Sequence, residues 1–415
     1  MAGREDVILS FGSLSFIGEI TTIVKNSGGK EFMTDLLECR KEIDVIDKEI
    51  LRLFEKRMKV CEDVAEYKIH TGKKVLDPKR EQDKIEVLKE SAHGEFNELG
   101  AQELFQQIMA ISRKRQYQLL TKNGVENDTK DYKMVDALPM TGVNVVFQGV
   151  EGAYSYAAMR AYFSDAVNSY HVKTFRDAME EVASGKADYA VLPIENSTEG
   201  IVTDIYDLLT EYQLYIVGEQ GVKVEHVLLG IPETSLDEIK TVYSHPQALA
   251  QCKKYLESHP DWKIVKTENT AGAAKKVHEE MNRSQAAIAS RAAGELYGLS
   301  VMAENICYND QNVTRFIIVS AHPVYEKSAA KVSVCFELPH ESGTLYNMLS
   351  HFIYNGLSMT KIESRPITGK KWEYRFFVDF EGNLEEPAVK NALRGLEAEA
   401  NRMRVLGNYG QQEEQ

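Results

Sequence analysis

The chain has 415 residues, and its 49 Lys and Arg against 63 Asp and Glu give a formal net charge of −14. This length predicts two or three domains, and the acidity argues against a protein that coats nucleic acid or an anionic membrane. No apolar run approaches the roughly 18 residues that cross a bilayer, and the cysteines and histidines show no CxxC or HExxH spacing, so we expect a cytoplasmic protein with reduced thiols and no metal.

Residues 1–32 are predicted to form a disordered extension, because glycines interrupt each apolar run. The segment also lacks the positive start and the small-residue cleavage site of a signal peptide. A second interpretation is that translation starts at Met33. The intact mass of the native protein would separate the two.

A helical domain is predicted over residues 33–121. Residues 35–70 contain neither Pro nor Gly, and their apolar residues recur at three- and four-residue steps, which is typical of one amphipathic helix of roughly 50 Å. Gly72 ends this helix, Asp77 and Pro78 begin a second, and residues 101–120 form a third after Gly100. So long a helix cannot bury its apolar stripe against two short partners, so we expect a dimer.

The charged and polar residues of this domain share faces. At about 100° per residue, Arg57 and Lys68 lie on one face, whereas Arg40 points elsewhere, toward the pocket of a partner subunit. Ser112 and Gln116 are four residues apart and face the same way. For Arg40 alone, a solvated surface charge is the stronger interpretation; Arg57 and Lys68 lie beside the apolar stripe and favour a pocket.

The segments ECRKEIDVIDKEILRLFEKR, DPKRE and SRKRQ, with Lys68 between the first two, resemble the all-helical chorismate mutase family. The resemblance implies an intertwined dimer that rearranges chorismate to prephenate, a pericyclic reaction that needs oriented carboxylates and a donor at the ether oxygen. The implied catalytic residues are, for the carboxylates, Arg57 of the same subunit and the partner subunit's Arg40. Lys68 and Gln116 are implied for the ether oxygen, Asp77 and Glu81 for the hydroxyl, and Arg80 and Ser112 for the wall. Because an amide donates at any pH, we expect little pH dependence of mutase activity near neutrality.

Residues 122–141 are polar and are predicted to be a linker. An α/β pattern follows over residues 142–321, with strands expected at 143–147, 189–193, 224–229, 241–244, 286–289 and 316–319. Polar side chains follow several of these strands, and ligands collect at strand ends in open α/β sheets. Taken singly, Asn196 and Ser197 could be a helix cap, Ser244 an N-cap, and Thr314 an ordinary strand residue.

Four motifs, GVEGAYS, PIENSTEG, YSHPQAL and NVTRF, resemble the prephenate dehydratase family. The resemblance implies two α/β lobes around a cleft and a reaction that removes CO2 and hydroxide from prephenate to give phenylpyruvate, in which a donor assists the departing hydroxyl. It implies Thr314 as the catalytic residue, an orienting donor more than a proton source. The cleft residues that it implies are Glu195, Asn196, Ser197, Ser244, Gln247, Arg315 and Phe316. Ala153 stands where the family commonly has Thr or Ser, so one hydroxyl is missing or is supplied by Ser155.

Residues 331–410 are predicted to fold in the order βαββαβ. This order and the runs Gly343-Thr344-Leu345-Tyr346 and Glu363-Ser364-Arg365-Pro366 resemble the ACT regulatory domains of dehydratases. The allosteric phenylalanine site implied by the resemblance comprises Gly343, Thr344, Leu345, Glu363 and Ser364. A ligand there can bias the cleft if it binds one of two states better. The alternative is a packing turn and an edge-strand proline.

Together the three segments resemble the bifunctional P-protein family of phenylalanine biosynthesis. The resemblance implies a multidomain enzyme without cofactor, with chorismate and prephenate as substrates, L-phenylalanine as feedback inhibitor, and a homodimer or higher homo-oligomer. It implies no nucleic-acid or membrane partner. Two alternatives stay open: a non-catalytic amino-acid sensor, against which Thr314 and the cations of the helical domain argue, and a dehydratase that prefers arogenate.

Overall fold

A computed structural model describes residues 36–125, 128–163, 166–309, 311–338, 340–341, 343–367 and 369–412. The predicted extension and the possible start at Met33 lie outside these residues. The chain divides into the units Met1–Tyr67 and Lys68–Gln415. Among the described residues, no helix is both long and apolar enough to span a membrane, and no group of acidic, His and Cys side chains is arranged to hold a metal ion.

The first three helices are α2 (Leu36–Thr71), α3 (Pro78–Glu90) and α4 (Glu95–Lys122). As expected, Asp77 caps α3, with its Oδ1 accepting the Arg80 N–H at 3.2 Å. The prediction that Gly100 breaks the chain before the third helix was wrong, because α4 passes through it. A glycine inside a helix costs only about 1 kcal/mol relative to alanine, which the rest of this long helix offsets.

The apolar stripe of α2 is exposed within its own unit. Leu36, Ile43, Ile46, Ile50 and Leu53 each expose at least half of their surface, from 50% to 62%. Their three-, four- and seven-residue spacing places them along one side of the helix. Within the unit Met1–Tyr67, the described residues therefore leave this stripe uncovered.

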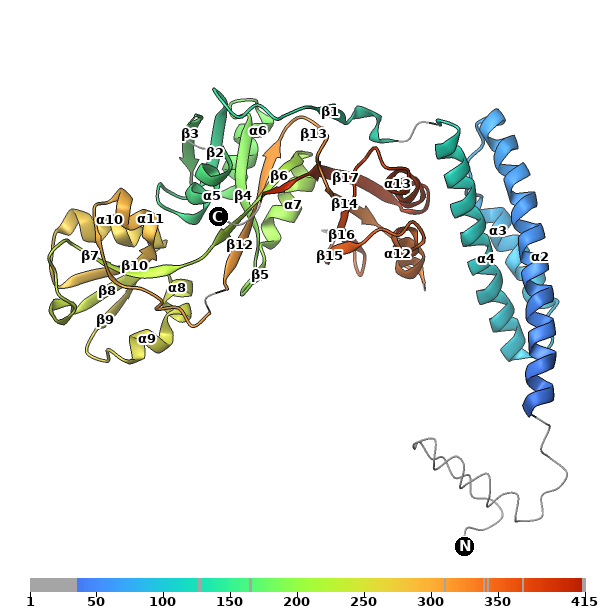
Figure 1. The fold of residues 1–415 in the computed structure, drawn as a ribbon, viewed down its shortest axis with the longest axis horizontal. Coiled ribbons are helices and arrows are strands. Elements are labelled where there is room, and N and C mark those ends of the chain that lie inside the picture. Colours follow the sequence, from blue (N-terminus) through green and yellow to red (C-terminus); the bar gives the residue numbers. More distant parts are fainter. Residues whose placement is uncertain are drawn as a thin grey trace, which may run out of the picture. The chain divides into compact units, whose positions relative to one another are not determined.

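The α/β region consists of two lobes (Figure 1). In the first lobe the strand order is β6-β12-β4-β2-β3, with β2 parallel to β3 and β4, and β12 antiparallel to β4 and β6. Apolar side chains of this sheet pack against helices in two buried clusters. Its elements are β2 (Asn144–Gln148), α5 (Tyr154–Phe163), β3 (Asn168–Val172), α6 (Phe175–Ala183), β4 (Tyr189–Asn196), β5 (Gly200–Ile201), α7 (Thr203–Tyr212), β6 (Tyr215–Lys223) and β12 (Val313–Ser320).

The second lobe is inserted between β6 and β12, with the strand order β11-β7-β10-β8-β9. Its helices cover both faces of the sheet, α10 and α11 on one and α8 and α9 on the other, each with its own buried cluster (Figure 1). Two chain crossings, β6 to β7 and β11 to β12, connect the lobes. The elements are β7 (His226–Gly230), the 3₁₀ helix Leu236–Glu238, β8 (Thr241–Ser244), α8 (Pro246–Gln251), α9 (Lys253–Glu257), β9 (Lys263–Lys266), α10 (Thr270–Glu280), β10 (Gln285–Ser290), α11 (Arg291–Leu296) and β11 (Ser300–Ala303).

The C-terminal region has the order β-α-β-β-α-β around one buried cluster. Its strand order is β15-β16-β14-β17, and β17 continues the sheet of the first lobe by pairing with β6, where Gly407 lies opposite Ile216. The elements are β14 (Lys331–Glu337), α12 (Thr344–Tyr354), β15 (Met359–Pro366), β16 (Tyr374–Glu381), α13 (Pro387–Glu399), β17 (Arg402–Tyr409) and β18 (Gln411–Gln412), which also pairs with β6.

The segment predicted as a linker contains local structure. A 3₁₀ helix covers Asp128–Asp131, and β1 (Lys133–Val135) pairs in parallel with β13 (Val324–Glu326). The Tyr132 hydroxyl donates to the Val405 carbonyl at 2.8 Å. This part of the segment is therefore attached to the sheet.

Candidate active sites

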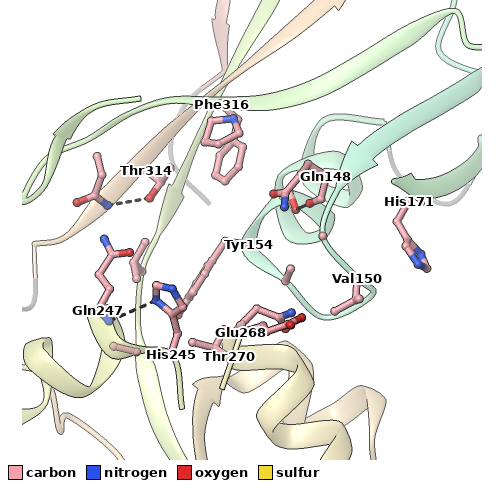
Figure 2. Close-up of a pocket in the computed structure, with 18 of the residues that line it drawn as sticks. Gln148, Val150, Tyr154, His171, His245, Gln247, Glu268, Thr270, Thr314 and Phe316 are labelled. Atoms are coloured by element: carbon pink, nitrogen blue, oxygen red, sulfur yellow. Dashed lines mark hydrogen bonds between the residues drawn. The ribbon is translucent and has the colours of Figure 1, made fainter. Parts of the chain in front are cut away.

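A cavity of about 820 Å³ is lined by residues of both lobes. In Figure 2, Thr314 and Phe316 lie above it, whereas His245, Gln247, Glu268 and Thr270 lie below. Thr314 and Phe316 alternate along β12. The lower residues come from the starts of α8 and α10 and from the residues just before these helices. The cavity thus brings together strand ends and helix starts that are far apart in the sequence.

Thr314 is oriented by Asn196. The two residues are opposite each other in the β12–β4 pairing, and the Asn196 amide donates to Thr314 Oγ1 at 2.8 Å, the dashed line at Thr314 in Figure 2. Asn196 is itself held by its Oδ1, which accepts the N–H groups of Thr198 and Glu199 at 3.0 Å each. Because Thr314 Oγ1 accepts from Asn196, its own proton can be donated to a molecule in the cavity.

A buried network of three side chains forms the wall beside it. The Tyr154 hydroxyl lies 2.9 Å from His226 Nδ1, and His226 Nε2 lies 3.1 Å from Gln251 Oε1. Burial lowers the pKa of His226 to about 4, so its ring is neutral near pH 7. The Tyr154 hydroxyl also donates to the Glu225 carbonyl at 3.0 Å, and the neutral ring can donate from Nε2 to Gln251 Oε1. The network fixes the Gln251 amide at the cavity.

Four of the predicted cleft residues do not line the cavity. Ser244 is fully buried and donates to the Ile288 carbonyl at 2.6 Å. Ser197 Oγ accepts the Val313 N–H at 3.0 Å and thereby fixes the start of β12. Their position supports the strands that carry the cavity residues, and a contact with substrate stays a prediction.

Glu195 and Arg315, the other two, face the C-terminal region. Glu195 binds Lys361 at 2.8 Å, and Arg315 binds Glu195 at 3.1 Å and Asp379 at 3.1 Å. Burial alone would raise the pKa of Glu195, but the hydrogen bond from Lys361 and the nearby charges lower it. For Arg315, burial opposes the charged form, yet its acidic neighbours raise the pKa above the ordinary value. Both side chains therefore stay charged.

The cavity has few charges but several groups that suit an anion. Lys173, His171 and His245 line it together with the acidic Glu268. The first turn of α10 also contributes, with Asn269 Oδ1 accepting the Gly272 N–H at 2.6 Å. Helix starts present N–H groups and the positive end of the helix dipole. Ser155 was predicted as one source of the hydroxyl that Ala153 lacks. In the structure its Oγ donates its proton to the Gln148 carbonyl at 2.5 Å.

The helical region gathers part of the predicted mutase set within the unit Lys68–Gln415. Lys68 Nζ donates to Gln116 Oε1 at 3.1 Å and to the Val75 carbonyl at 2.7 Å. Gln116 and Ser112 are buried on α4, and the Gln116 amide donates to the Ser112 carbonyl at 3.3 Å. A cationic donor and an amide therefore lie side by side.

Glu81 on α3 is held by an arginine that sequence reasoning did not single out. Arg113, 7% exposed, binds Glu81 at 2.5 Å and, through its other nitrogens, Glu399 of α13 at 2.9 Å. Arg80, which precedes Glu81 on the first turn of α3, is exposed. Arg113 thus connects a predicted mutase residue to the C-terminal region.

The remaining two predicted mutase cations belong to the unit Met1–Tyr67. Arg40 is exposed near the start of α2. Arg57 is partly buried, with Nη1 3.8 Å from Cys61 Sγ one turn further along the helix. Their roles stay predictions.

The predicted phenylalanine residues lie on two elements. Gly343 caps α12 with φ of 81°, a left-handed conformation that favours glycine. Thr344 and Leu345 follow in the first turn, and Leu345 packs against the C-terminal core. Glu363 and Ser364 lie on β15, the last strand in the sheet order. A ligand role for these residues stays a prediction.

Residues that sequence reasoning missed are Tyr154, His226, Gln251 and Arg113. Gln251 lies one helical turn after Gln247, so the spacing on α8 was a usable signal. His226 begins a strand and has no motif around it. Only contacts across many residues reveal it.

Comparisons with known proteins divide the chain in the same way. A family model described as chorismate mutase type II matches residues 39–117, and one described as prephenate dehydratase matches residues 145–324. The bifunctional chorismate mutase/prephenate dehydratase of Enterobacter agglomerans is 36% identical over 382 residues, covering 90% of this chain and 95% of that protein. The protein of the same description from Escherichia coli K12 is 36% identical over 383 residues, with 90% and 96% covered.

Two solved structures are each similar to about two thirds of the chain. The prephenate dehydratase of Arthrobacter aurescens in complex with L-Phe has a TM-score of 0.59 and 34% identity, covering 65% of this chain and 90% of that chain. A protein called GqqA, described as a novel type of quorum quenching acylase, has a TM-score of 0.60 and 34% identity, covering 65% and 98%.

Proposed function

Because the chain belongs to the family of bifunctional chorismate mutase/prephenate dehydratases, we propose that its two sites act in sequence and that its C-terminal region senses L-phenylalanine. The product of the first reaction, prephenate, is the substrate of the second. The cytoplasm is the proposed location. Prephenate is the proposed substrate in preference to arogenate.

In the proposed mutase site, Lys68 and Gln116 donate to the ether oxygen of chorismate as its bond breaks. The support is that the two side chains meet, with Lys68 Nζ 3.1 Å from Gln116 Oε1. For Gln116 to donate as well, its amide must turn from the Ser112 carbonyl to which it now donates. Glu81 receives the substrate hydroxyl while Arg113 holds it. The carboxylates bind Arg57 of the same subunit and the partner subunit's Arg40. The exposed stripe of α2 supports the dimer that this arrangement needs.

In the proposed dehydratase site, the two carboxylates of prephenate bind at the helix starts and basic groups of the cavity. The electrons of the bond to the departing CO2 enter the ring, and the ring expels its hydroxyl as hydroxide, which takes a proton to leave as water. Thr314 donates to that hydroxyl. The observation that carries this proposal is the Asn196–Thr314 hydrogen bond, because it leaves the Thr314 proton for the cavity.

In the proposed regulation, phenylalanine binds near the start of α12 and β15. Two ion pairs connect this region to the cavity strands: Lys361 to Glu195, which precedes Asn196, and Asp379 to Arg315, which follows Thr314. A shift of β15 or β16 on ligand binding would therefore reach both residues that we assign to hydroxyl departure. The phenylalanine complex of the Arthrobacter aurescens relative supports a site of this kind.

A paired assay tests the whole proposal. The full chain should form phenylpyruvate from chorismate, and L-phenylalanine should slow the second step. A protein that binds phenylalanine but forms neither product would instead be the non-catalytic sensor. Competition between prephenate and arogenate distinguishes the substrate.

Single substitutions separate the two sites. Arg57→Ala should remove mutase and spare dehydratase activity, whereas Thr314→Ala should do the reverse, each by roughly 100-fold or more as expected for loss of a transition-state contact. Thr314→Ser keeps the hydroxyl and should retain much of the activity. Loss of both activities from either alanine change would contradict independent sites.

A further inference from the structure

Two cysteines of the second lobe lie in contact behind the cavity wall. Cys252, fully buried after α8, and Cys307, partly buried between β11 and β12, have their Sγ atoms 3.7 Å apart. The residues beside them are joined by a backbone hydrogen bond from Tyr308 N–H to the Gln251 carbonyl at 3.0 Å. The two segments are therefore held side by side, with the two thiols in contact.

The two thiols differ in reactivity. The hydrogen bond with Cys252 lowers the pKa of Cys307 to about 7, and the hydrogen bond from the backbone N–H of His226 adds to this effect. The same hydrogen bond, together with burial, raises the pKa of Cys252 above its ordinary range. Cys307 is thus the thiolate that attacks an oxidant, and Cys252 is the thiol that can react with the product.

We propose that Cys252 and Cys307 form an oxidative modification site, at which a peroxide converts the thiol pair to a disulfide and slows the dehydratase reaction. The Cys307 thiolate attacks one peroxide oxygen, the O–O bond breaks, and hydroxide leaves, so that Cys307 becomes a sulfenic acid. The Cys252 thiol then forms the S–S bond, the S–O bond breaks, and water leaves. In total two thiols lose two electrons and two protons, and the peroxide is reduced to two waters.

The disulfide would disturb the cavity because of what adjoins each sulfur. Gln251, next to Cys252, lines the cavity, and the backbone N–H of His226 donates to Cys307. The sulfur atoms must approach from 3.7 Å to about 2.05 Å, which displaces the wall that His226 and Gln251 share. Displacements of about 1 Å can reduce catalysis by roughly 100-fold. The expected effect on activity rests on the proposed dehydratase role of this cavity.

The test uses the full chain, reduced, freed of reductant and treated with hydrogen peroxide. Peptide mapping without reduction should find the Cys252–Cys307 crosslink. Dehydratase activity measured on prephenate should fall about tenfold or more and return with dithiothreitol, while mutase activity measured on chorismate should stay within about twofold. Cys307→Ser, which preserves the size of the side chain, should keep its dehydratase activity under peroxide. Cys39→Ala, which removes a partly buried thiol of α2, should respond like the unmodified chain.

Three results would overturn the proposal. The first is oxidation of Cys307 without any Cys252–Cys307 crosslink. The second is the crosslink with unchanged dehydratase activity, and the third is an equal loss of activity in Cys307→Ser. The crosslink is read by mass, independently of activity, so a reduced chain without dehydratase activity contradicts the proposed function and not the disulfide.

Discussion

At the scale of single residues, the cavity depends on polar groups whose orientation is fixed by neighbours. Asn196 directs Thr314 because turn N–H groups hold its carbonyl oxygen, and His226 directs Gln251 because burial keeps its ring neutral. Both pairs present an amide whose hydrogen-bonding does not change near pH 7. The chemistry at the cavity therefore relies on positioned donors.

Burial of His226 predicts a pH-dependent stability. The pKa of His226 is about 4 in the folded chain, below the ordinary value of about 6.5, so the unfolded chain binds the proton more readily. The stability that the neutral ring contributes is fully present above pH 6.5 and is lost as the pH falls toward 4. At pH 5 the loss in the free energy of unfolding is about 2 kcal/mol. Urea unfolding at pH 7.5 and 5 should show it.

The matched variant for this measurement is His226→Gln. In this variant the difference in the free energy of unfolding between pH 7.5 and pH 5 should be smaller by about 2 kcal/mol. His93→Gln, an exposed histidine outside the lobes, should leave the difference unchanged. An equal pH dependence in the unmodified chain and His226→Gln would show that His226 does not cause it.

At the scale of elements, the C-terminal sheet and the first-lobe sheet join at one close approach. A Cβ at Gly407 would lie 2.0 Å from the Ile216 carbonyl oxygen, so only glycine lets β17 come this close to β6. The ion pairs of Arg315 and Glu195 lie across the same junction. Backbone contact and charge pairing together join the two sheets.

Gly407→Ala should separate the strands at this junction. Because the clash is with backbone, the free energy of unfolding should fall by about 1–3 kcal/mol, as measured by thermal or urea unfolding. Gly410→Ala is the control, because a Cβ there meets nothing within 4 Å. Equal stability of the two variants would contradict the close approach.

Arg113 makes a second junction, between α4 and α13. Its charge and the hydrogen bond from His351 overcome the effect of burial and lower the pKa of Glu399 to about 2. Arg113→Leu would leave this buried carboxylate without its arginine partner and with the His351 contact alone, so we expect a loss of roughly 3 kcal/mol at pH 7. The deficit should shrink as the pH falls below about 4.5, where the unfolded carboxyl is protonated. Arg115→Leu, which removes a neighbouring cation hydrogen-bonded to Gln118, should show no comparable deficit in urea unfolding.

At the scale of the molecule, the unit Lys68–Gln415 places a proposed regulatory region in direct contact with a proposed catalytic one. β15 carries both Lys361 and the predicted ligand residue Glu363, and Lys361 binds the neighbour of Asn196. The proposed inhibitor site at Glu363 is thus only two residues along β15 from Lys361, the residue that contacts the cavity strand. This short connection is enough to couple the two sites.

Lys361→Met should weaken this coupling. The concentration of phenylalanine that halves dehydratase activity should rise roughly fivefold or more, while activity without phenylalanine changes little. Lys370→Met is the control, because its exposed pair with Glu373 stays within the C-terminal region. If both variants keep normal inhibition in the dehydratase assay, the Lys361–Glu195 contact does not transmit it.

The sequence by itself determined the features that depend on neighbours along the chain. The apolar period of α2, the cap at Asp77 and the β-α-β-β-α-β order were all predictable, because periodicity and capping act over a few residues. The motifs also indicated Thr314 and Asn196, which the structure brings into contact. The predicted break at Gly100, before the third helix, was wrong because the favourable residues of a long helix outweigh one glycine.

Only the tertiary structure decided which polar side chains reach the cavity. Gln251 enters it through a contact with His226, 25 residues away, whereas Glu195 turns from it to Lys361, 166 residues away. Arg113 meets Glu399 across 286 residues. Each of these side chains could equally be a surface group in its own segment. Its partner, and the burial that makes the partner necessary, exist only once the sheets and helices have packed.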